Sequence, residues 1–172
     1  RTDGNPLFMT HVVDLLLARG WLRACDDGWT CDFDRARAPE LVPDTLRQMI
    51  AQEIAGLGAV EQQVLEAASA AGAEPAAAAV AAALVMPVTE VEEALVGLAR
   101  RGQLVAEDGA DAWPDGTRTA RFAFIHALYR SFLYERLPPA RRRELHERIG
   151  LRLAAAFGDR TGAIAAALAQ HF

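Results

Sequence analysis

The chain has 172 residues, 52% of them hydrophobic, and a net charge of −5. This length suffices for one domain or two small ones with a packed core, and the acidic balance weighs against a nucleic-acid partner. No apolar run is long enough to span a bilayer, so we expect a cytoplasmic protein without a membrane partner.

Residues 1–57 are predicted to form a lid-like helical segment with a small hairpin. A turn signal at 4–6 precedes a short helix expected over 10–19. Residues 21–33 fit a hairpin, and a linker follows at 34–43. Asp44 is a good N-cap for a further helix, whose apolar stripe ends at a pair of glycines.

Two cysteines, Cys25 and Cys31, flank the turn of the predicted hairpin. The chain shows no signal peptide, so reduced thiols are expected. No matching group of histidines or cysteines accompanies them, which makes a metal site improbable. The sequence leaves open whether the two cysteines approach each other.

Residues 58–137 carry the most regular pattern. Pro75 suits the first turn of a helix, and Thr89 suits an N-cap. Three helices followed by a two-stranded hairpin is the element order of a winged helix. The predicted helices cover 60–71, 75–85 and 89–101, and the predicted strands cover 103–107 and 121–125.

His126 stands where the second of these strands turns into a helix. The apolar residues from Ile125 to Leu137 recur at three- and four-residue steps, which indicates one buried helical face. A histidine at such a junction either caps the helix and satisfies backbone groups, or serves a functional site. The pattern alone favours the structural interpretation.

Residues 138–172 are predicted to start an antiparallel array of tetratricopeptide-like helices. After Pro138 and Pro139, a helix is expected over 140–157, with a stripe made of Leu145, Ile149 and Leu153, and another over 159–172. Such stripes need a neighbour to cover them, so we expect further helical repeats. The chain also begins without methionine, which suggests a piece of a longer protein.

The sequence contains no phosphate-binding loop, no Ser-His-Asp order and no metal-ligand spacing. Its four histidines fall in separate predicted elements. We therefore expect that the chain is not an enzyme by itself and binds no metal.

DNA binding by the predicted winged helix is a weaker hypothesis. Its third helix carries Glu90, Glu92 and Glu93 on the exposed side, where carboxylates repel phosphates. The predicted wing holds two arginines and three aspartates that offset them: Arg118, Arg121, Asp108, Asp111 and Asp115.

Four segments taken in order suggest a family. They are Gly4-Asn5-Pro6-Leu7-Phe8, Leu41–Arg47, Phe124–Arg130 and Arg141–His146. Their succession resembles the C-terminal part of STAND-class signalling ATPases, in particular the large bacterial ATP-dependent LuxR-type transcriptional regulators and cyclase-associated ATPases. In that family an AAA-type nucleotide-binding domain precedes a helical lid, a winged helix and tetratricopeptide-like repeats.

The resemblance implies a nucleotide site. The family's Gly-x-Pro motif lies near the adenine, and Gly4, Asn5 and Pro6 match it. His126 matches the histidine of a Met-His-Asp motif that touches the β-phosphate of ADP in the inactive state. The neighbouring methionine and aspartate are replaced, by Ile125 and Ala127, so the acidic partner is missing.

The sequence thus predicts a mainly α protein: the regulatory arm of a nucleotide-switched signalling ATPase. The Walker motifs would lie upstream, so ATP or ADP would bind the longer protein and this chain weakly at most. The expected partners are the upstream ATPase domain and downstream repeats, with a protein partner or self-assembly as further possibilities. The alternatives are a DNA-binding winged-helix regulator and a plain protein-interaction module. The inducer and output domain stay open.

Overall fold

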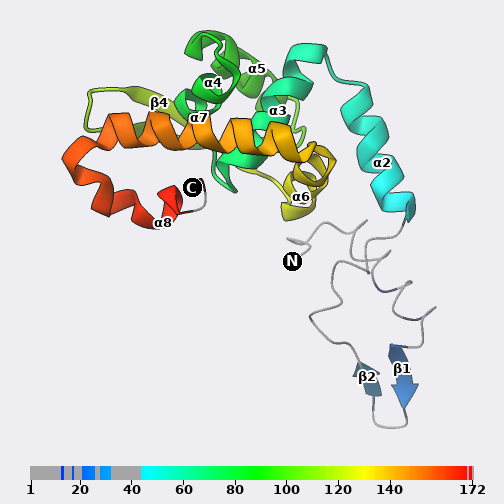
Figure 1. The fold of residues 1–172 in the computed structure, drawn as a ribbon. Helices are drawn as coiled ribbons and strands as arrows, with labels where there is room; N and C mark the ends of the chain where they lie inside the picture. The colour runs from blue at the N-terminus through cyan, green and yellow to red at the C-terminus, as the bar shows by residue number, and fades with distance from the viewer. Residues whose placement is uncertain are drawn as a thin grey trace. The chain divides into compact units, whose positions relative to one another are not determined.

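The computed structural model of the chain is mainly helical (Figure 1). The structure describes residues 21–25, 28–31 and 44–169, together with Val13, Leu17 and His171. The chain divides into two compact units, Arg1–Ala55 and Gly56–Phe172, which are treated separately below. Most of the helix expected over 10–19, and the linker at 34–43, lie outside the described residues.

The first unit contains the predicted hairpin. Strands β1 (Leu22–Cys25) and β2 (Gly28–Cys31) pair antiparallel, with Leu22 opposite Cys31 and Cys25 opposite Gly28. The α carbons of the two cysteines are therefore three residue steps apart along the strands, roughly 10 Å. A disulfide needs at most about 7 Å between α carbons, so this backbone does not support one. Helix α2 (Asp44–Ala55) follows, as predicted.

The second unit begins with three short helices, α3 (Ala59–Ala71), α4 (Ala77–Leu84) and α5 (Val88–Arg100). Helix α4 packs against both of its neighbours and against the later helix α7. Six of the eight residues of α4 are buried, and most of its residues are alanines. Small side chains let the surrounding helices approach the α4 backbone closely, so its composition fits its central position.

Two predicted helix starts are wrong. Helix α4 begins at Ala77, because Pro75 belongs to an extended segment: its carbonyl accepts a hydrogen bond from the Phe122 amide at 3.0 Å. Proline lacks an amide hydrogen but keeps its acceptor, so it can pair at the edge of a sheet. Helix α5 is capped by Pro87, not by Thr89, which lies in its exposed first turn.

The two strands of the second unit are longer than predicted. Strand β3 (Val105–Ala112) pairs antiparallel with β4 (Arg118–Phe124). Gly109, which lies between the two predicted strands, has φ of 92° next to an irregularity in the register, so it forms part of a bulge within β3. The backbone of Ala76, just before α4, also forms an antiparallel bridge to β4 at Arg121.

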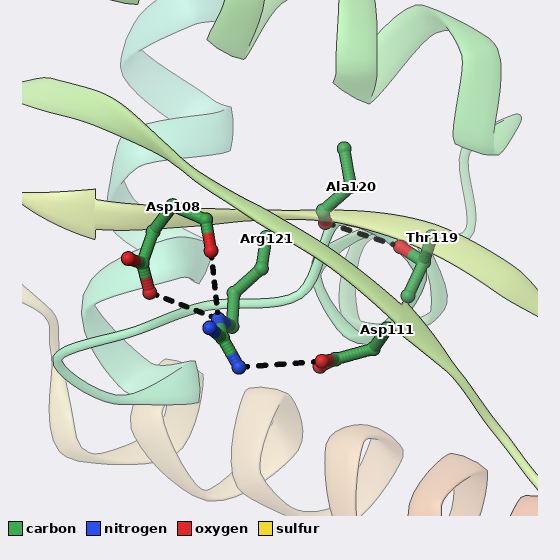
Figure 2. A network of polar contacts seen from close by, with 5 residues as sticks. All are labelled: Asp108, Asp111, Thr119, Ala120 and Arg121. Atoms are coloured by element: carbon green, nitrogen blue, oxygen red, sulfur yellow. Dashed lines mark hydrogen bonds and ion pairs between the residues drawn. The ribbon is translucent and has the colours of Figure 1, made fainter.

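The side chain of Arg121 stabilises the bulge in β3. Figure 2 shows the Arg121 side chain between two carboxylates of β3. Its Nε lies 2.9 Å from Asp108 Oδ2, and its Nη1 lies 3.3 Å from Asp111 Oδ1. Of the charges expected to offset one another in this hairpin, Arg121 therefore does so by direct contact with Asp108 and Asp111.

After β4 the chain is helical. The elements are α6 (Ala127–Arg136), α7 (Pro139–Phe157), the 3-10 helix η2 (Gly158–Ile164) and α8 (Ala165–Leu168). The single helix expected over 159–172 is therefore wrong. Gly158, with φ of 47°, ends α7, and the chain continues in a tighter helix.

Helix α7 packs against α4 and α3 within the second unit (Figure 1). Two residues of its predicted stripe, Leu145 and Ile149, are 0% and 1% exposed. These two residues are therefore covered within this unit, so their burial does not require further repeats.

Candidate functional site

Of the four residues predicted to bind nucleotide, only His126 is among the described residues; Gly4, Asn5 and Pro6 lie outside them. His126 occupies the N-cap of α6, with φ of −142° and ψ of 136°. Its carbonyl accepts a hydrogen bond from the Tyr129 amide at 3.1 Å. The structural interpretation is therefore correct for the backbone of this residue.

The imidazole of His126, in contrast to the backbone, does not cap the helix. It makes no side-chain capping hydrogen bond to α6, although it sits at the position where polar side chains usually cap. The residue is 9% exposed, and its ring centroid lies 5.8 Å from that of Tyr129. The ring is therefore largely buried at the strand–helix junction, and it does not cap the helix.

The corner that carries His126 is firmly attached to the rest of the unit. The amide of Ile125 donates to the Leu104 carbonyl at 3.0 Å. Arg130 Nε donates to the carbonyl of Ser69, in α3, at 3.1 Å. The first turn of α6 contains no acidic residue, so the positive end of its helix dipole is not offset there. An imidazole and a helix N-terminus together favour an anion.

A second polar cluster was missed by the sequence reasoning. Tyr134 Oη and His146 Nε2 are 2.9 Å apart, and His146 Nδ1 lies 2.8 Å from His171 Nδ1. The described histidines, His126, His146 and His171, lie in separate segments as expected, but two of them meet in the fold. No spacing in the sequence signals this, because the contact depends on how the chain returns after α7.

Burial controls the ionisation of this cluster. Desolvation lowers the pKa of His146, with a further contribution from the positive charges of Arg130 and Arg142. Desolvation also lowers the pKa of His171, and the neighbouring imidazole adds to the effect. The contact between the two ring nitrogens needs one hydrogen and one lone pair, so neutral rings fit the geometry.

The glutamates at the start of α5 differ in their surroundings. Glu92 accepts a hydrogen bond from the Ala120 amide at 3.1 Å, which anchors α5 to β4. Glu90 and Glu93 are exposed. This end of α5 therefore presents two carboxylates to solvent.

The turn of the hairpin is bound to α7. Arg152 reaches Asp115 Oδ2 at 2.9 Å and Thr117 Oγ1 at 2.7 Å, and its guanidinium lies 4.9 Å from the centre of the Trp113 indole. Hydrogen bonds from Thr117, and then the contact with Arg152, lower the pKa of Asp115 to about 2. Arg152 therefore binds the β3–β4 hairpin of its own chain.

Within the part of the chain that the structure describes, no three His, Cys, Asp or Glu side chains converge to hold a metal ion. None of the described helices is both long and apolar enough to cross a bilayer. A comparison with known proteins finds no matching family model, no similar curated protein and no similar solved structure.

Proposed function

We propose that this chain is the non-catalytic regulatory arm of a nucleotide-switched signalling ATPase of the STAND class. In this proposal residues 58–137 form a winged helix, which couples the ATP or ADP state of an upstream ATPase domain to inducer sensing. The element order supports the winged helix: α3, α4 and α5 are followed by the antiparallel β3–β4 pair, with the Ala76–Arg121 bridge at its edge. Tetratricopeptide-like helices after residue 137 and a cytoplasmic location belong to the same proposal.

The observation that carries the proposal is the position of His126. Its imidazole is confined at the N-terminus of α6 and is not used for capping. A ring nitrogen that donates a hydrogen bond, next to the positive end of a ten-residue helix, suits the β-phosphate of ADP. The resemblance to the Met-His-Asp motif suggests the same contact.

The switch would act as a rigid body. Because Arg130 ties α6 to α3, His126 moves with the unit rather than by itself. When the unit lies against the ATPase domain, the imidazole reaches ADP; when the unit swings away, the contact is lost. Nucleotide would then bias the two arrangements by its different affinity for each.

The test is the ADP affinity of the full-length protein, ATPase domain included, by calorimetry. His126→Ala should weaken ADP binding by about 1–3 kcal/mol, the range for loss of a hydrogen bond to a charged group. His126→Gln, which keeps an N–H donor, should weaken it less. His146→Ala removes a histidine elsewhere in the same unit and serves as the control. Unchanged affinity in folded His126→Ala would refute the nucleotide contact.

A further inference from the structure

The side of α5 that faces away from the core forms a shallow open groove. The opposite side packs Val91, Leu95 and Leu98, all 0% exposed, into the core. The groove has a volume of about 420 Å³. It is lined by what we call the outer face of α5: Thr89, Glu92, Glu93, Val96, Gly97 and Arg100.

A glycine lies at the middle of this outer face. A side chain at Gly97 would meet only Arg101 Nη1, at the ordinary distance of 3.5 Å, so the fold of the unit itself does not require glycine here. Glycine inside a helix is destabilising relative to alanine. What glycine provides is space on the helix surface for another group to approach closely.

Two opposite charges flank the glycine and have no partner among the described residues. Glu93 and Arg100 are both exposed, and neither makes a hydrogen bond or ion pair there. Their neighbours differ: Glu92 binds the Ala120 amide, and Arg101 pairs with Glu61. Glu93 and Arg100 are seven residues apart, which places them about 10 Å apart along the helix axis on the same side.

The outer face of α5 is complementary to the same face of a second, antiparallel copy. If a second α5 lies antiparallel on the first, with the two-fold axis between Val96 and Gly97, each Glu93 meets the partner copy's Arg100. Val96 of one copy then fills the space left by Gly97 of the other. An interface of this kind uses one patch twice, which is how two-fold dimers are built.

We propose that the outer face of α5 binds a second copy of this chain, with the two α5 helices antiparallel and Glu93 paired to Arg100 across the two-fold axis. The proposal does not depend on nucleotide binding. It also assigns a use to the helix that a DNA-binding winged helix would place in the major groove.

The test is sedimentation velocity of the 172-residue chain over a range of concentrations, at low and high salt. We expect a reversible dimer that weakens as salt rises, because the pairs are exposed to solvent. Glu93→Arg should weaken the dimer at least about 10-fold, since two attractive contacts per dimer become repulsive, and Arg100→Glu should act alike. Gly97→Leu should also weaken the dimer, because the larger side chain fills the space that Val96 of the other copy would occupy.

The decisive variant reverses both charges. In a two-fold dimer, Glu93→Arg combined with Arg100→Glu restores complementarity, so dimerisation should return to within about 3-fold of wild type. Glu147→Arg, an exposed charge reversal on α7, should leave the dimer unchanged. A chain that stays monomeric at all concentrations would overturn the proposal, because the face would then be free or covered by another part of the chain. Failure of the double variant to recover would overturn it equally.

Discussion

Replacement of Thr119 by valine tests how the hairpin and the helices of the second unit depend on each other. Helix α4 begins at Ala77, and its N-cap, Ala76, has no side chain able to accept a hydrogen bond. The missing acceptor comes from β4: Thr119 Oγ1 accepts from the Ala78 amide at 2.9 Å. Both residues are 3% exposed, so water cannot take over this role.

Valine has nearly the shape of threonine, so Thr119→Val removes the acceptor while keeping the packing. An unsatisfied buried donor costs about 1–3 kcal/mol, and loss of a helix cap costs about 0.5–2 kcal/mol. We therefore expect the free energy of unfolding of the unit Gly56–Phe172 to fall by about 1–2 kcal/mol. Thr119→Ser keeps the oxygen and should cost less than valine.

Urea denaturation is the assay, with the midpoint expected to fall and the slope unchanged. Hydrogen exchange adds a local measurement, since the amide of Ala78 should lose protection in Thr119→Val but keep most of it in Thr119→Ser. The reasoning would be refuted if the valine variant matched wild type within about 0.5 kcal/mol, or if serine proved the more damaging change.

Two further predictions concern backbone strain and pH. Val85 ends α4 with φ of 58° and is 76% exposed, so Val85→Gly should raise the free energy of unfolding by roughly 1 kcal/mol, whereas Val85→Ala, which keeps the β carbon, should gain less in the same urea titration. The lowered pKa values of His146 and His171 mean that the unfolded chain binds more protons below pH 6.5. Stability should therefore be fully present above pH 6.5 and fall as the pH drops below it, and replacement of both histidines by glutamine should flatten this dependence; an unchanged slope in that variant would contradict the assignment.

Local patterns in the sequence sufficed for most of the secondary structure. The pattern of residues 21–33 predicted the first hairpin, and Asp44 predicted a helix start that the structure confirms closely. Apolar spacing identified Leu145 and Ile149 as buried residues of α7. These features depend on interactions within a few residues, such as capping, turn geometry and the helical period.

Other features were misread because their cause lies far away in the chain. Pro75 looks like the start of a helix, yet β4 recruits it into an extended edge through the Phe122 amide. Gly109 lies outside the predicted strands, yet pairing with β4 extends β3 beyond it, with a bulge at this position. In both cases a backbone hydrogen bond to a distant strand outweighed a weak local preference.

The features of the candidate site also divide into those that the sequence predicted and those that only the structure revealed. The sequence by itself determined that His126 stands at a strand–helix junction and that the helix expected over 89–101 carries three glutamates near its start. Only the tertiary structure decided that the His126 ring does not cap α6, that His146 meets His171, and that Glu93 and Arg100 are left exposed beside Gly97. The physical reason is that charge and helical period are carried by neighbouring residues, whereas the partner of a side chain is chosen by packing between segments that are remote in sequence.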